Sequence, residues 1–432
     1  MNQSQTYTQP AGLWFISAAS FCERFALFMM RALLIIYMIE TVKMSKSDAV
    51  SLYGFYAVLG GGAAVLAVLG GFLGDRLGYR KTLLGASAVI ALGLFIAAVP
   101  SKSALVLTMV LVTLGSGFFK VNINALTGLL YNKDDIRRDG GFTYLAVFPN
   151  LGGFAAGMIA GFAFSKQPQY AFILAGLIML IAAALLFIGR ASLKPLQQAA
   201  PVTGRNFALR FGLVAAVLFT VLLFAALTQK PGALMNLFGF HFTNRVIGNF
   251  EMPAASLQSV GYIFFIIFAF LMPSVYTWCA KRFGNAGRSK IPFAFIFYAL
   301  GFAVLFIMAL QAPQLDFKNP VKLSLAYIVI AHAFFALGEL FVFPLIYSFI
   351  SNNAPAKYAG SFMGLAILFC VLPAAIGNFI SGRVYGLWGN MTLPNTALTG
   401  GLLLLALISV PIVFFVIKRV SVKLAFDNEE TL

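Results

Sequence analysis

Residues that build metal sites and disulfide frameworks are scarce in this sequence. The 432 residues include two histidines and three cysteines, Cys22, Cys279 and Cys370, which lie in or at the ends of apolar segments. No metal-ligand spacing or disulfide framework is visible, so the cysteines are interpreted as small core residues. The glycine runs have no strand–turn–helix context that would make them phosphate-binding loops. We therefore expect no cofactor, no metal, no enzymatic activity and no ATP-driven step.

Charged residues are also few, and acidic ones are especially rare. Only 10% of the residues are charged, with 13 acidic against 30 basic, whereas 61% are hydrophobic and the mean hydropathy is +0.91. This composition excludes a soluble globule and predicts a protein that crosses a lipid bilayer many times. The net charge of +17 invites a nucleic-acid partner. We reject that partner, because the basic residues lie in short loops between apolar segments, where they orient a membrane protein.

Hydropathy predicts twelve spans, which should all be helical because lipid offers the backbone no other hydrogen-bond partners. Their approximate ranges are 12–40, 49–74, 82–99, 104–128, 141–164, 170–189, 208–228, 256–279, 290–310, 323–349, 361–382 and 397–417. The predicted fold is all-α, with two six-helix bundles. The predicted domains are an N-terminal bundle at 1–190, a cytoplasmic linker at 191–207, a C-terminal bundle at 208–418 and a cytoplasmic tail at 419–432.

The distribution of basic residues predicts the orientation. If the spans alternate, 18 basic residues lie on the side of the termini and 9 on the other side. Both termini are therefore expected in the cytoplasm. The N-terminal residues contain no basic region followed by a cleavage motif, so we expect no cleaved signal peptide. The absence of a long outer domain favours a bacterial inner membrane.

Five charged residues lie deep within the apolar spans. Glu23, Arg24 and Arg31 belong to the first span, Lys120 to the fourth and Glu339 to the tenth. A charge at the bilayer centre costs about 2.5–3.5 kcal/mol on insertion scales, so such residues usually face a partner or a polar cavity. One interpretation is a structural ion pair between helices. The other is a pathway for an anionic substrate and protons.

The two buried carboxylates and three cations should converge, because unpaired buried charges are costly. Glu339 comes from the second half of the chain and the cations come from the first. Such a dipolar cavity suits a zwitterion, with its ammonium toward Glu339 and its carboxylate toward Arg31 and Lys120. We expect this site near the bilayer midplane between the halves.

The loop after the second span reads GFLGDRLGYRK, residues 71–81. Its small residues allow close helix approach, and Asp75 with Arg76, Arg80 and Lys81 can pair with a neighbouring helix end. The segment resembles the loop motif of the major facilitator superfamily. The resemblance implies a gating and structural role for Asp75, Arg76 and Arg80.

Further motifs resemble the proton-dependent oligopeptide transporter family of that superfamily. They are ERF and MRALL in the first span, GSGFFKVNINAL at 115–126, RRDGGFTYLAVFPNLGG at 137–153 and FFALGELFVFP at 334–344. The resemblance covers nearly the whole chain. It implies that Arg31, Lys120 and Glu339 bind substrate and that Glu23, Arg24 and Lys120 couple transport to protons. It also implies that Asn150 lines the pocket, although an interhelical hydrogen bond explains this asparagine equally well.

The sequence departs from the family pattern at several pocket positions, so it resembles a divergent member of the family. Ser20 replaces the first glutamate of the family's E-x-x-E-R motif, and the linker is too short for the two extra helices of many bacterial members. Other replacements, aligned by eye, are Leu27, Phe28, Ala64, Ala146, Gln229, Gly261 and Ala366. The charge framework is kept while the side-chain pocket is rebuilt.

These observations predict a proton-coupled symporter that imports di- or tripeptides, or a related zwitterion, by alternating access and that functions as a monomer in the lipid bilayer. Two alternatives stay open. One is a carrier of the same fold for another zwitterion, such as an amino acid or a modified peptide. The other is a non-transporting receptor. His332, two helical turns before Glu339, is either a core histidine or part of a proton relay.

Overall fold

The computed structural model describes residues 8–133, 135–164, 167–196, 204–229, 242–251, 257–283, 290–312, 321–369 and 394–429. The chain forms two compact units. Unit 1 consists of Met1–Thr203 and Ile350–Leu368, and unit 2 consists of Gly204–Phe349 and Phe369–Leu432. The first division falls inside the predicted linker. The short segment Ile350–Leu368, from the second half of the chain, packs with unit 1.

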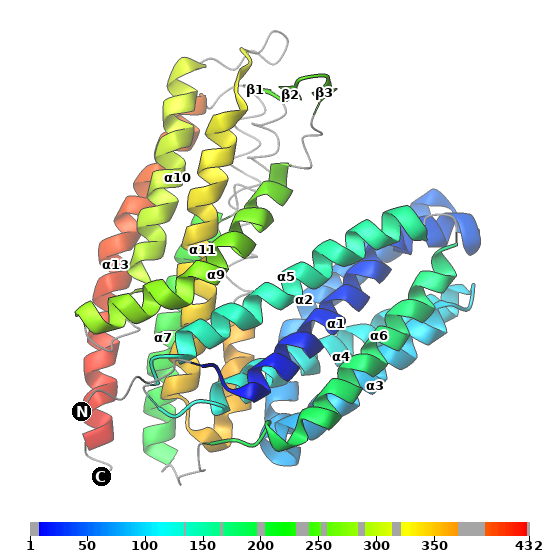
Figure 1. Ribbon diagram of the computed structural model, residues 1–432, viewed down its shortest axis with the longest axis horizontal. Helices are drawn as coiled ribbons and strands as arrows, with labels where there is room; N and C mark the ends of the chain where they lie inside the picture. Colours follow the sequence, from blue (N-terminus) through cyan, green and yellow to red (C-terminus); the bar gives the residue numbers. More distant parts are fainter. Residues whose placement is uncertain are drawn as a thin grey trace. The chain divides into compact units, whose positions relative to one another are not determined.

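Unit 1 is a bundle of long helices (Figure 1). Its elements are α1 (Ala11–Ile36), the π-helical turn η1 (Tyr37–Thr41), α2 (Lys46–Leu77), α3 (Tyr79–Ala97), α4 (Lys102–Leu129), α5 (Arg138–Ala163), α6 (Pro168–Ile188), the 3₁₀ turn η2 (Gly189–Ala191) and η5 (Ala356–Tyr358). Local signals set the helix ends. The Ser45 hydroxyl accepts a hydrogen bond from the Asp48 amide at 3.1 Å at the start of α2. Gly78, with φ of +91°, separates α2 from α3.

Helices of unit 1 approach closely where small residues face a neighbour. The main packing pairs are α1 with α5 and α6, α3 with α4 and α6, and α2 with α4. Gly152 illustrates the contact between α5 and α1, because a Cβ there would collide with the carbonyl oxygen of Phe21. Small residues at such crossings are typical of packed membrane helices.

Unit 2 is also helical. It contains α7 (Gly204–Gln229), α9 (Leu257–Phe283), α10 (Pro292–Gln311), most of α11 (Leu325–Asn353) and α13 (Asn395–Glu429). Helices α10 and α13 pack together, and α13 also packs on α7. The Tyr276 hydroxyl of α9 donates a hydrogen bond to the Leu340 carbonyl of α11 at 2.7 Å. The Phe335 ring of α11 lies 5.0 Å from the Phe302 ring of α10, centroid to centroid.

Two short strand pairs flank the helices of unit 2. Strand β1 (Thr243–Asn244) pairs in parallel with β4 (Leu323–Ser324), and β2 (Val246–Ile247) pairs antiparallel with β3 (Phe250–Glu251). These strand pairs were not predicted from the sequence. The tenth span was predicted to begin near residue 323, and the helix begins at Leu325.

Each of the twelve predicted spans overlaps a described helix, although the eleventh, 361–382, is described only up to residue 369. Among the described residues, eight helices are long and apolar enough to cross a membrane. The final helix α13 continues to Glu429, into the predicted tail. Cys22 and Cys279 are buried free thiols, and Cys370 lies outside the described residues.

Candidate functional site

Glu23 is held at the contact between α1 and α4. Its residue is 3% exposed, and its carboxylate accepts a hydrogen bond from the Ser116 hydroxyl of α4 at 2.9 Å. The Arg24 Nε lies 3.8 Å from the other carboxylate oxygen. Both neighbours give this carboxylate polar contacts, and a carboxylate without them would be costly to bury in an apolar bundle. The predicted association of Glu23 and Arg24 is present, whereas Ser116 was not singled out from the sequence.

Lys120 lies one helical turn after Ser116 on α4, so both side chains occupy one face of this helix. Because Ser116 meets Glu23, that face is the one that approaches α1. The Lys120 residue is exposed. The first unit therefore carries Glu23, Arg24 and Lys120 along the α1–α4 contact.

Arg31 lies two turns after Arg24 on α1 and is exposed. Its guanidinium carbon is 5.8 Å from the ring centroid of Phe28 and 5.7 Å from that of Tyr56 on α2. Planar aromatic faces stabilise a guanidinium, and Arg31 also has a side-chain hydrogen bond with Tyr56. A guanidinium has five N–H donors, so Arg31 can bind a carboxylate and keep these contacts. Tyr56 is a second neighbour that the sequence did not reveal.

Asn150 is half-buried on α5 and follows Pro149. Its side-chain amide nitrogen donates to the Ala146 carbonyl one turn earlier, at 2.8 Å. This bond lies within α5, so the alternative of an interhelical bond for this donor is wrong. The side-chain oxygen has no hydrogen-bond donor among the residues the structure describes, and it can accept one from a ligand.

Glu339 belongs to unit 2, where it lies half-buried on α11. No described residue forms a hydrogen bond or an ion pair with its carboxylate. Tyr262 of α9 is near enough to interact electrostatically with it. A carboxylate without a fixed partner can accept a cationic group. Its predicted approach to Arg31 and Lys120, which belong to unit 1, stays a prediction.

Asp75 accepts four hydrogen bonds in unit 1. Its carboxylate accepts hydrogen bonds from the Gly360 amide at 2.8 Å, the Ser361 amide at 2.9 Å, the Ser361 hydroxyl at 2.5 Å and the Tyr79 hydroxyl at 2.6 Å. The two backbone amides belong to the start of the helical segment 356–369, and an anion is favourable at a helix start. The backbones also touch, since a Cβ at Gly71 would collide with the Gly360 carbonyl. The predicted pairing of Asp75 with a neighbouring helix end is therefore present.

The basic residues of this loop contact other groups. The Arg76 guanidinium carbon lies 4.1 Å from the Phe72 ring centroid. One terminal nitrogen of Arg80 is buried without a hydrogen-bond partner. Among the described residues, neither arginine forms a hydrogen bond or an ion pair with the segment after residue 350, whereas Asp75 makes the predicted contact.

A second contact with this segment was missed by the sequence analysis. Arg138, which is 2% exposed at the start of α5, donates a hydrogen bond to the Ser351 hydroxyl at 2.8 Å. It also donates to the carbonyl oxygens of Tyr131 and Asn132. Gly128 has no side chain, and this allows α4 to pack closely against Ser351. Arg138 stands in the RRDGGFT motif, but a motif does not identify the partner of its side chain.

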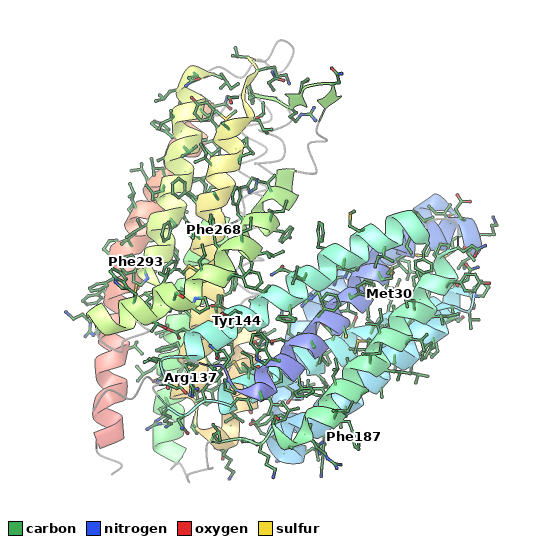
Figure 2. All side chains as sticks on the ribbon, in the orientation of Figure 1. Met30, Arg137, Tyr144, Phe187, Phe268 and Phe293 are labelled. Carbon is green, nitrogen blue, oxygen red and sulfur yellow. The ribbon has the colours of Figure 1, made fainter. Side chains whose placement is uncertain are left out.

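Arg137 ties the residues before α1 to the loop before α5 (Figure 2). Its guanidinium donates to the Thr8 carbonyl at 2.9 Å and pairs with the Asp135 carboxylate at 2.8 Å. The Tyr131 hydroxyl donates to the Gln9 side chain at 2.8 Å. Partial burial opposes ionisation of Asp135, but the hydrogen bonds and charge of Arg137 outweigh it and hold the pKa of this carboxyl below its usual value. This stabilisation is complete above the ordinary pKa of about 3.9 and is lost as the pH falls through the lowered pKa.

Arg137→Ala should release residues 8–10 from this loop. One lost hydrogen bond of about 1 kcal/mol predicts roughly five-fold faster amide exchange in the peptide covering these residues. Arg190→Ala is the control, because the recorded contact of this exposed arginine is with the Phe187 ring. Unchanged amide exchange in Arg137→Ala would show that the contacts of Arg137 do not hold residues 8–10 in place.

Known proteins resemble the chain over most of its length. The family model described as Major Facilitator Superfamily matches residues 16–378. The peptide transporter YePEPT of Yersinia enterocolitica is 26% identical, over 84% of this chain and 85% of that protein. The di-/tripeptide transporter of Lactococcus lactis is also 26% identical, over 88% and 79%.

Solved structures share the fold. A peptide transporter in complex with alafosfalin superposes with a TM-score of 0.63 at 22% identity, covering 96% of this chain and 97% of that one. The human organic anion transporter MFSD10 gives 0.66 at 17% identity, with coverage of 93% and 100%. The predicted all-helical fold is thereby confirmed, and the described helices are consistent with twelve spans. The chain is a multi-pass membrane transport protein of the Major Facilitator Superfamily, and within that superfamily it is similar to peptide transporters.

Proposed function

We propose that this protein is a proton-coupled symporter that imports di- or tripeptides, or a closely related zwitterion, by alternating access. The observation that carries the proposal is the set of ionisable groups on α1, α4 and α11, in a chain whose relatives include peptide transporters. A protein with only a structural role gains little from charges within membrane helices, because each is costly to insert.

The substrate termini are assigned to groups of opposite charge. Arg31 and Lys120 bind the carboxylate, and Glu339 binds the ammonium. Two features support the assignment: Arg31 is exposed and has N–H donors beyond its hydrogen bond with Tyr56, and Glu339 has no ion-pair partner among the described residues. Asn150 contributes an acceptor oxygen for the peptide's amino end.

Proton coupling is assigned to Glu23, Arg24 and Lys120. Glu23 exchanges its hydrogen-bond and ion-pair partners when the transporter changes state, and its proton affinity changes with them. Ser20, which is 4% exposed one turn before it, cannot carry a second proton. This predicts fewer proton sites in α1 than in relatives with two glutamates.

Gating is assigned to the contact between Asp75 and Gly360–Ser361, with Arg76 and Arg80 as structural residues of the same loop. The contact joins the first half of the chain to a segment from its second half, so it must change if the halves move during transport. We place it, with both termini, on the cytoplasmic side of a bacterial inner membrane, because basic residues are concentrated there. The transporter works as a monomer and takes its energy from the proton gradient, without a cofactor.

Asp75→Asn tests the gating assignment. The amide keeps one acceptor oxygen but turns a donor toward the amides of residues 360 and 361, so charge-assisted bonds are lost. We expect initial uptake to fall about ten-fold, since such bonds contribute about 1.5–3 kcal/mol each. Asp48→Asn, an exposed carboxylate at the other end of α2, is the control. Wild-type uptake in Asp75→Asn would contradict a gating role.

A same-fold carrier for another zwitterion is the second candidate. The observation that favours it is the apolar character of positions where the family has polar or aromatic residues: Leu27 is 3% exposed and Ala366 is fully buried. These side chains remove hydrogen-bonding groups that peptides use.

Uptake by the purified protein in liposomes separates the candidates. Dialanine, trialanine and free alanine are offered with and without an imposed pH gradient. Peptide uptake that requires the gradient supports the symporter, while uptake of alanine alone supports the second candidate. Binding without flux of any solute would favour a receptor and would remove the proposal.

A further inference from the structure

His332 stands on the same face of α11 as Glu339 in unit 2. The two residues are seven positions apart, which is two helical turns, or about 10 Å along the helix. His332 is half-buried, and its ring lies 6.5 Å from the Phe335 ring, nearly edge-on at 87°. Phe335 is itself fixed against α10, so the imidazole has a firm support on one side.

Gly261 of α9 makes the room for this imidazole. A Cβ built at Gly261 would lie 3.2 Å from Nδ1 of His332. Any larger side chain at 261 would therefore compete with the ring for the same space. The absence of a side chain at Gly261 therefore leaves the space that the His332 imidazole occupies.

Neither ring nitrogen of His332 has a hydrogen-bond partner among the residues that the structure describes. Nε2 is buried without one. Nδ1 faces Gly261, which has no side chain. A buried polar group is normally hydrogen-bonded, and an exception requires a physical reason. The simplest explanation is that the imidazole hydrogen-bonds to a polar group of a bound ligand.

We infer that His332 is a specificity-determining residue that hydrogen-bonds the third residue of a tripeptide whose amino group is bound at Glu339. This inference rests on the proposed function and adds a length preference to it. An extended peptide advances about 3.3–3.6 Å per residue, so three residues span about 10 Å. That length matches the separation of His332 from Glu339, whereas a dipeptide of about 7 Å is too short.

The contact suits a neutral imidazole. One ring nitrogen then donates, so the ring can hydrogen-bond to an oxygen of the third residue's carboxylate, which lies about 10 Å from the amino nitrogen of an extended tripeptide. A neutral group adds no further charge to a site that already binds a zwitterion. The expected preference is therefore for tripeptides, because the carboxylate of a dipeptide ends about 7 Å from its amino nitrogen.

The test compares KM for trialanine and dialanine in liposomes containing wild type, His332→Phe and His332→Gln. We expect His332→Phe to raise the trialanine KM about five-fold, as expected for one hydrogen bond, and to leave dialanine within two-fold. His332→Gln keeps a donor and an acceptor and should recover part of the loss. The ratio of the two KM values is independent of how much protein is correctly folded.

Gly261→Ala provides an independent variant, because the new methyl group displaces the imidazole. It should shift the KM ratio in the same direction as His332→Phe. Gly401→Ala on α13 is the matched control, since nothing lies within 4 Å of the added Cβ.

Equal KM changes for both peptides, or an unchanged ratio in His332→Phe, would overturn the role of His332 while leaving the transporter assignment intact. Wild-type protein that imports neither peptide would remove the proposed function, and the role of His332 with it.

Discussion

Replacing Glu339 by glutamine should abolish gradient-driven uptake of dialanine and trialanine. The change keeps the size of the side chain and removes the negative charge that the substrate ammonium needs. Losing one partner of a desolvated ion pair costs about 3–5 kcal/mol, which corresponds to at least a hundred-fold weaker binding. Uptake into liposomes with an imposed pH gradient is the measurement.

This variant should fold as well as the wild type. No hydrogen bond or ion pair with a described residue is lost, so thermal unfolding should be unchanged. Glu40→Gln, at the exposed end of the first span, is the matched control and should transport normally. If Glu339→Gln retains wild-type uptake, the ammonium is bound elsewhere and the proposed site is wrong.

Lys120→Ala should produce the second large effect, again a loss of driven uptake. Lys120 is assigned both to the substrate carboxylate and to coupling, so two measurements are needed. Driven uptake reports both roles, while counterflow without a pH gradient reports substrate binding and movement alone. We expect driven uptake to disappear and counterflow to fall at least ten-fold, as expected for a lost charge-assisted contact.

Lys102→Ala is the control for this change, because Lys102 is an exposed lysine at the opposite end of α4. Lys120→Arg keeps the charge and should recover part of the counterflow. Normal counterflow in Lys120→Ala with loss of driven uptake would restrict the lysine to coupling. Wild-type values in both assays would exclude it from both roles.

The charged site could be anticipated only in part. The family resemblance implied a joint role for Glu23 and Arg24, whose side chains lie 3.8 Å apart. Ser116 could have been noticed, since it stands one turn before Lys120 on the same helix face. Tyr56 could not, because nothing in the sequence indicates which residue of α2 approaches Arg31.

The sequence by itself determined the membrane class, the position of each helix and the set of charges that need partners. These follow from the composition of single segments, because lipid obliges every span to satisfy its own backbone. The helix ends at Ser45 and Gly78 are likewise local.

Only the tertiary structure decided which partners are chosen. The contacts of Asp75 with Ser361, of Arg138 with Ser351 and of His332 with Gly261 join residues that are distant in the chain. Each depends on how closely two helices approach, and glycines at the crossings set that distance. Helix formation is local, whereas the pairing of helix faces is a property of the packed bundle.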